Sequence, residues 1–162
     1  MVFILSVFLN QVNVELEKVR SQFPEITSEE QANSFIEKLK NDDSSEAKGY
    51  TAAMIFMKSS FVKFPFTKLK YFKQGKTLLD ETITQDPSNI EIRYIRFLMQ
   101  KQIPDFLGYN ENIKEDFNII VNGLKTCNLQ REAKSQMLQN MLLTKDLTPG
   151  DQEKLKQLLK TV

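Results

Sequence analysis

The chain has 162 residues, of which 41% are hydrophobic, and a formal net charge of +1 at neutral pH. It has no histidine and one cysteine, Cys127, so it lacks the commonest metal ligand and general base and cannot form an intrachain disulfide. We therefore expect no metal site, no cofactor and no catalytic centre, and we expect residues 1–162 to form a single helical domain.

The first nine residues, Met1 to Leu9, are almost entirely apolar and resemble the apolar part of a secretion signal. The absence of a basic residue before Lys18 and of a small-x-small cleavage site argues against a signal. The alternative is a first helix with an apolar stripe formed by Leu9, Val12, Leu16, Val19 and Phe23. Residues 1–13 are thus either an atypical or truncated secretion signal or the start of a helix. Cytoplasmic and exported, cell-envelope locations both stay open.

Two helices are predicted next. The segment Thr27-Ser28-Glu29-Glu30 has the pattern of a capping box with Thr27 as the cap, and it opens a helix. The apolar face of that helix consists of Ala32, Phe35, Ile36 and Leu39. A polar run at residues 41–45 ends it, and a helix that is apolar on most sides follows from about Glu46 to Val62.

A fourth helix is predicted to begin near Pro65 or Thr67. One face carries Leu69, Phe72, Leu79 and Ile83, with Gly75 between them. A glycine inside a helix costs about 1 kcal/mol relative to alanine. Because such a cost is usually tolerated where another backbone must come close, Gly75 predicts a tight helix crossing.

The fifth helix follows a second capping box, Ser88-Asn89-Ile90-Glu91, directly after Pro87. Its only polar stripe consists of Arg93, Arg96 and Gln100. The loop after it, residues 103–110, is unusually apolar for a surface connection.

Three further helices are predicted from apolar spacing around residues 113–124, 129–141 and 149–162, the last with Thr148 as its cap. The fold class is therefore all-α, with about eight antiparallel helices joined by short turns. Such helical hairpins form a short right-handed solenoid or a bundle.

The stretch from Gly75 to Asn89 resembles the second helix and exit turn of a tetratricopeptide repeat. Gly75, Leu79, Thr82 and Pro87 have the spacing at which a small, a bulky apolar, a small and a proline residue recur in that repeat. Pro65 and Lys63 depart from the pattern, and no second copy follows. The segments Glu91 to Phe97 and Phe106 to Asn110 also look like a family of uncharacterised bacterial helical proteins. The likeness to that bacterial family implies a fold and brings no activity with it. The likeness to the tetratricopeptide repeat implies a degenerate helical domain that, by analogy with tetratricopeptide arrays, presents a groove between helix pairs to a peptide or partner protein.

Residues 50–79 contain six lysines and no acidic residue, whereas residues 1–49 carry five basic and nine acidic residues. The lysines, among them Lys63, Lys70 and Lys73, alternate with aromatic residues. This pattern is typical of a surface that binds nucleic acid or an anionic membrane. The alternative is that the aromatic residues belong to the core and the lysines surround it.

Arg93 and Arg96 lie one turn apart, so together they could clamp a carboxylate of a partner, with Gln100 beside them. Alternatively they pair with internal acids such as Glu91, Glu115 or Asp116. Phe106 and Tyr109 could form an exposed recognition element or fill space between helices.

These features favour a noncatalytic protein-interaction or scaffold module whose partner is a protein or peptide of unknown identity. The candidate partner-binding residues are Arg93, Arg96, Gln100, Phe106, Tyr109, Lys63, Lys70 and Lys73. Binding to nucleic acid or an anionic membrane through residues 50–79 is the alternative function.

Overall fold

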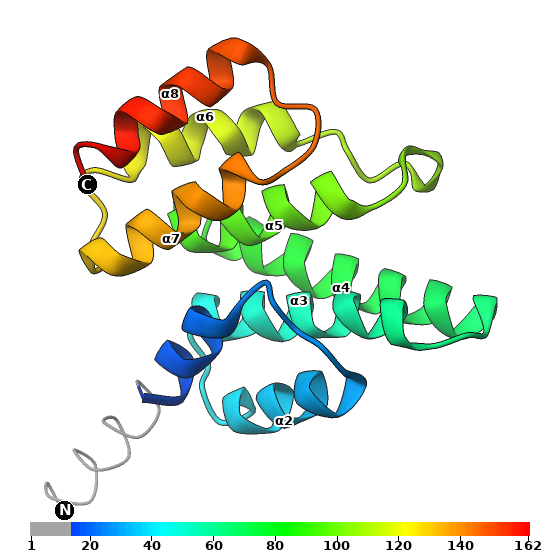
Figure 1. The fold of residues 1–162 in the computed structure, drawn as a ribbon. Helices are drawn as coiled ribbons and strands as arrows, with labels where there is room; N and C mark the ends of the chain where they lie inside the picture. The colour runs from blue at the N-terminus through cyan, green and yellow to red at the C-terminus, as the bar shows by residue number, and fades with distance from the viewer. Residues whose placement is uncertain (1–13) are drawn as a thin grey trace, which may run out of the picture. The chain divides into compact units, whose positions relative to one another are not determined.

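A computed structural model describes residues 14–162, and every regular element in that part of the chain is helical. The all-α fold class predicted from the caps and the apolar spacing is confirmed. The chain divides into two compact units, one ending at Asp86 and the other running from Pro87 to Val162 (Figure 1). The sequence interpretations that involve Leu9 and Val12, a secretion signal or a first helix, fall outside the described residues.

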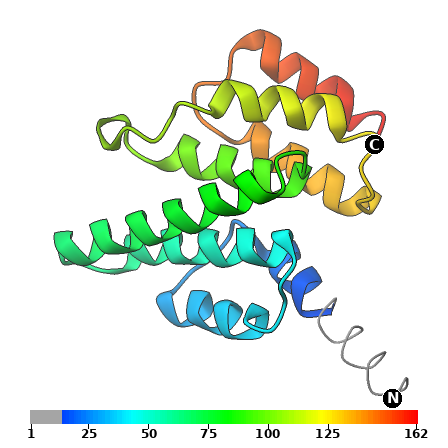
Figure 2. The same ribbon diagram turned by 180° about the vertical axis from the view of Figure 1, so that it is seen from behind.

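The first unit is built around α3 (Ser45–Phe61), which contacts both α2 (Glu29–Leu39) and α4 (Pro65–Gln85). α3 and α4 form a long hairpin whose turn extends past α2 in Figures 1 and 2. A further helical stretch at residues 14–22 buries Leu16 and Val19, two members of the predicted stripe. Phe23, the next residue, packs its ring nearly perpendicular to the Tyr50 ring, with 5.4 Å between the ring centroids. Apolar burial around α3 therefore holds this unit together.

Two helix caps lie one residue later than predicted. Ser28, not Thr27, caps α2 by accepting from the backbone N–H of Gln31 at 3.1 Å, and Gln31 in return accepts from the N–H of Thr27. Asn89, not Ser88, caps α5 by accepting from two backbone N–H groups. In both segments two adjacent residues are suitable caps, so the sequence pattern alone did not choose between them. The predicted caps of α5 and α2 are corrected by one position.

The predicted close crossing at Gly75 is confirmed. A methyl group placed on Gly75 would lie 2.8 Å from Cγ of Phe56 and 2.9 Å from the carbonyl oxygen of Ala52, both on α3. Only a residue without a side chain lets the two helices approach this closely. Leu79, Thr82 and Ile83 follow on the same buried face of α4. Leu69, which was predicted to share that face, is instead 40% exposed, because it lies near the turn beyond the tightest contact.

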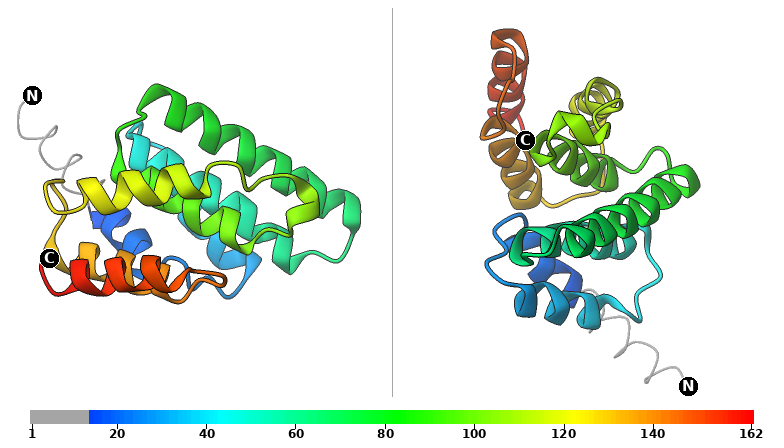
Figure 3. Two further views of the ribbon diagram at one scale, coloured as in Figure 1. Left: turned by 90° about the horizontal axis from the view of Figure 1, so that it is seen from above. Right: turned by 90° about the vertical axis from the view of Figure 1, so that its right-hand side faces the viewer.

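The second unit contains α5 (Ile90–Gln102), a short 3-10 helix (Asp105–Leu107), α6 (Ile113–Gly123), α7 (Arg131–Leu142) and α8 (Pro149–Leu159). Helix α5 pairs with α6, and α7 pairs with α8, which also touches α6 (Figure 3). The side-chain amide of Asn140 donates to the hydroxyl of Tyr94 at 2.8 Å and so connects α7 to α5. Burial of Tyr94 raises the pKa of its hydroxyl, which stays protonated.

None of the helices in residues 14–162 combines the length and the apolar character needed to cross a lipid bilayer.

Replacing Gly75 by alanine is expected to lower the free energy of unfolding by about 1–3 kcal/mol, because the added methyl group must displace α3. The matched control is Gly150→Ala in α8, where the nearest atom to an added methyl group is 3.9 Å away. That change should be neutral or slightly stabilising. Urea denaturation followed by circular dichroism measures both, and equal effects would contradict the close crossing.

Candidate functional site

The polar stripe of α5 is turned inward. Arg93 and Arg96 are each 6% exposed and Gln100 is 2% exposed, although all three are polar and were predicted as partner-binding residues. Polar groups with so little exposure need partners inside the protein. The groups that face them are side chains of α6 and of the residue that precedes it, together with a backbone carbonyl of the turn before α5.

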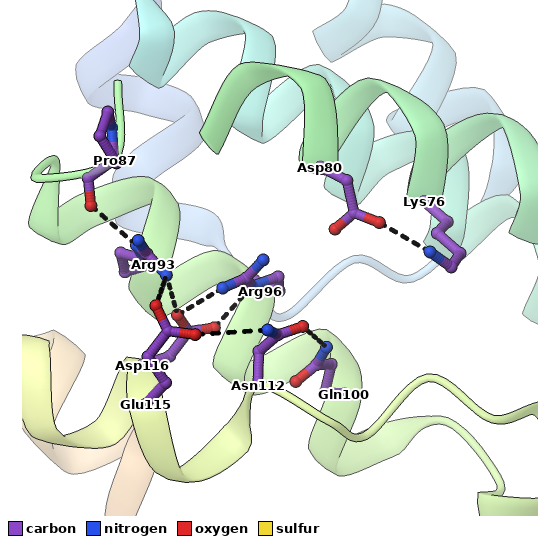
Figure 4. Close-up of polar contacts among 9 residues, drawn as sticks. All are labelled: Lys76, Asp80, Pro87, Arg93, Arg96, Gln100, Asn112, Glu115 and Asp116. Atoms are coloured by element: carbon purple, nitrogen blue, oxygen red, sulfur yellow. Dashed lines mark hydrogen bonds and ion pairs between the residues drawn. The ribbon is translucent and has the colours of Figure 1, made fainter. Parts of the chain in front are cut away.

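The centre of this arrangement is Asp116 on α6, which has no exposed surface (Figure 4). Its carboxylate accepts from Arg96 through Nε at 2.7 Å and through Nη2 at 2.8 Å, a two-point contact. It also accepts from Nη1 of Arg93 at 2.9 Å. The Nε of Arg93 donates to the carbonyl oxygen of Pro87 at 2.9 Å, which ties the start of α5 to the same network. The planar guanidinium groups are well suited to such fixed geometry.

Glu115 completes the charge balance at the edge of the network. It accepts from Nη1 of Arg93 at 2.9 Å and from the side-chain amide of Asn112 at 3.3 Å. The hydrogen bond from Asn112, and after it the guanidinium of Arg93, hold the pKa of Glu115 below its ordinary value. The charges of Arg93 and Arg96 are thus matched by those of Glu115 and Asp116.

Gln100 extends the network by one hydrogen bond. Its side-chain amide donates to the oxygen of Asn112 at 3.3 Å, whereas its own buried oxygen has no hydrogen-bond partner among residues 14–162. Because Asn112 also donates to Glu115, it connects Gln100 to the carboxylates of the network (Figure 4).

The alternative in which Arg93 and Arg96 form an exposed clamp for a partner is therefore wrong, and the candidate partner-binding residue Gln100 is buried with them. The guanidinium groups already bind Asp116 and Glu115, and breaking these buried contacts to bind a partner would leave charges unpaired. The alternative that the sequence left open, pairing with internal acids, is confirmed for Glu115 and Asp116. This network acts as a structural element of the second unit.

The apolar loop after α5 separates its two aromatic residues. Tyr109 is 4% exposed and fills space inside the unit, so the prediction that it recognises a partner is corrected. Phe106, in the 3-10 helix, is 86% exposed. The left-handed conformation of Gly108, with φ of 62°, turns the chain between them.

The aromatic residues of segment 50–79 also divide into two groups. Phe56 and Phe72 pack against each other in the first unit at 5.9 Å between ring centroids, and Tyr71 donates to Glu29 at 2.9 Å. Phe64 and Phe66, in contrast, are 76% and 89% exposed at the turn between α3 and α4. The alternative that the aromatic residues belong to the core thus holds for the first group and is wrong for Phe64 and Phe66.

The six lysines of the same segment divide similarly. Lys58 lies over the Tyr71 ring and near Glu29, and Lys76 pairs with Asp80 at 2.7 Å. The other four are exposed and make no ion pair within residues 14–162: Lys63, Lys68, Lys70 and Lys73. We call these four lysines, together with Phe64 and Phe66, the α3–α4 tip.

The spacing along α4 arranges part of the tip on one face. Phe66, Lys70 and Lys73 follow at intervals of four and three residues, so their side chains share one side of the helix, opposite the side on which Gly75 and Leu79 are buried. Phe64 precedes the helix, and no side chain caps the N-terminus of α4. The positive end of the helix dipole therefore adds to the positive charge of the lysines.

Sequence reasoning missed Glu29 as the residue that engages Lys58 and Tyr71, because the three lie far apart along the chain. It named Asp116 only as one of several possible partners of the arginines. Within residues 14–162, no group of three or more histidine, cysteine or carboxylate side chains is placed to hold a metal ion.

No protein-family model, no curated protein and no solved structure matches the chain. Function must therefore be argued from the residues and their surroundings alone.

Replacing Asp116 by asparagine is expected to lower the free energy of unfolding by about 3–5 kcal/mol, because the buried guanidinium groups of Arg93 and Arg96 would lose the carboxylate charge that both contact. Glu115→Gln is the matched control and should cost much less, since the Glu115 side chain is 53% exposed.

Chemical denaturation as a function of pH measures both variants. The lowered pKa of Glu115 means that its carboxylate stabilises the unit above the ordinary carboxyl pKa, and that this contribution is lost as the pH falls through the lowered value. Glu115→Gln should remove that part of the acid sensitivity. Similar stability losses in the two variants would contradict the central role of Asp116.

Proposed function

We propose that the chain is a noncatalytic binding module that attaches to anionic membrane surfaces through the α3–α4 tip. The observation that carries this proposal is the exposure of Phe64 and Phe66 beside four lysines that have no ion-pair partner among the described residues. Exposed phenylalanines within a cluster of positive charge match the two forces that hold proteins at an anionic bilayer: apolar insertion and attraction to acidic headgroups.

The magnitudes of these two forces support the proposal. Transfer of one exposed phenylalanine side chain out of water contributes about 1.5–3 kcal/mol. Each lysine near an anionic leaflet contributes about 1 kcal/mol. The two phenylalanines alone would not give firm attachment, and neither would the four lysines alone. Together, the apolar and the electrostatic contributions compensate for the cost of holding the chain at the surface.

The location of the tip favours a membrane over nucleic acid. Phe64 and Phe66 lie where α3 turns into α4, at the end of a hairpin that extends past α2 (Figures 1 and 2). Such an end can enter a bilayer surface without distorting the helices. Single-stranded nucleic acid instead needs a groove along which successive bases stack.

A peptide-binding groove, the function implied by the tetratricopeptide resemblance, has less support. Its predicted contacts depended on Arg93 and Arg96, whose guanidinium groups are engaged with Asp116. The tip needs no rearrangement of buried charges before it binds.

Phe66→Ser is expected to weaken binding to vesicles that contain phosphatidylserine by about tenfold, because the apolar transfer energy of one side chain is lost. Phe64→Ser should act in the same direction, and the double variant should be weaker than either. Vesicle co-sedimentation at low salt provides the measurement.

Phe106→Ser is the matched control, since Phe106 is as exposed as Phe66 but lies in the second unit. It should bind like the unchanged protein. Absence of binding to acidic vesicles at low salt would refute the proposal, as would selective binding to single-stranded oligonucleotides.

Replacing both Lys70 and Lys73 by glutamine should weaken vesicle binding by roughly thirtyfold at low salt. The difference from the unchanged protein should shrink as the ionic strength rises, because salt screens charges at the surface.

The double substitution Lys145→Gln and Lys156→Gln removes the same charge from exposed positions of the second unit and serves as the control. If it weakened binding equally, overall charge rather than the tip would be responsible. Equal binding to neutral and acidic vesicles would also contradict the role of the lysines.

A further inference from the structure

A surface pocket in the second unit is lined mainly by basic residues. It has a volume of about 370 Å³ and lies between the loop from α6 to α7, the first turn of α7 and the end of the chain. Figure 1 shows the C-terminus beside that loop. The volume is at the lower end of the range for small-molecule sites.

Four positively charged side chains line the pocket: Lys125, Arg131, Lys134 and Lys160. No aspartate or glutamate side chain is part of the lining, and none of the four makes an ion pair within the described residues. All the charged side chains of the lining are therefore positive. Positive charges that line one pocket repel one another, so a bound anion that carries several negative charges would relieve the repulsion.

The local structure holds part of this charge in place. The ammonium group of Lys134 donates to the carbonyl oxygen of Lys125 at 3.2 Å, which ties the first turn of α7 to the preceding loop. Helix α7 begins at Arg131, and no side chain caps its N-terminus. The helix dipole at this end attracts anions, although the exposed Glu132 offsets part of that attraction.

We propose that this pocket binds a small anion of the phosphate class that carries two or more negative charges. An arginine fork and several ammonium groups suit phosphoryl oxygens, and four positive charges match a doubly or more highly charged ligand better than a single carboxylate. The proposal depends on the second unit alone and does not rest on membrane binding by the α3–α4 tip.

A phosphate group can come from a soluble molecule or from a lipid headgroup. The first arm of the test titrates the full chain with pyrophosphate and follows backbone amide signals by NMR. Shifts confined to residues 125–134 and 160–162 are expected. Arg131→Gln and Lys160→Gln should each weaken pyrophosphate binding by about tenfold, the effect of losing one charge-assisted contact.

The second arm compares vesicles that contain a polyphosphoinositide with phosphatidylserine vesicles of equal total charge. A preference for the former that Arg131→Gln abolishes identifies a headgroup as the ligand, whereas pyrophosphate binding without that preference identifies a soluble one.

Lys145→Gln is the matched control, because Lys145 is equally charged, exposed and located in the loop at the other end of α7. It should leave pyrophosphate binding unchanged. Equal weakening by Lys145→Gln would overturn the proposal, as would the absence of binding in both arms or amide shifts spread over the whole surface.

Discussion

The buried carboxylate of Asp116 decides which side of α5 faces the interior of the second unit. By accepting three hydrogen bonds from Arg93 and Arg96, it turns the polar stripe of α5 toward α6 and neutralises it. A helix that would otherwise offer two adjacent guanidinium groups to a partner becomes part of the interior. Within residues 14–162, two clusters of basic side chains that make no ion pair lie elsewhere, at the turn of the α3–α4 hairpin and around the start of α7.

In the first unit, the aromatic and basic residues of the α3–α4 hairpin are packed toward its middle and exposed at its turn. Toward the middle of the hairpin, Phe56 packs on Phe72, and Lys58 is held by Tyr71 and Glu29. At the turn itself α3 has ended, so nothing from that helix covers Phe66, and its neighbour Phe64 lies outside any helix. The same stretch of sequence thus supplies both a core and an exposed end.

Helical periodicity was sufficient to predict the fold class and most helix bounds, because apolar spacing and caps are local signals. The glycine at position 75 also predicted a close crossing, since few other causes place a glycine inside a helix. Periodicity could not show which side of α5 would be covered. Whether Arg93 and Arg96 face water or Asp116 depends on contacts across 20 and 23 residues of chain, and no local pattern encodes them. Exposure of Phe66 likewise depends on where the neighbouring helix stops.

The crossing at Gly75 also limits which sequences can adopt the first unit. Because the space above Gly75 is occupied by the Phe56 ring and the carbonyl of Ala52, a larger residue at position 75 requires a smaller one at position 56. The carbonyl cannot be removed, so only one of the two obstacles can be relieved by substitution. Glycine should therefore be retained at position 75 in evolution, above all wherever position 56 keeps an aromatic ring.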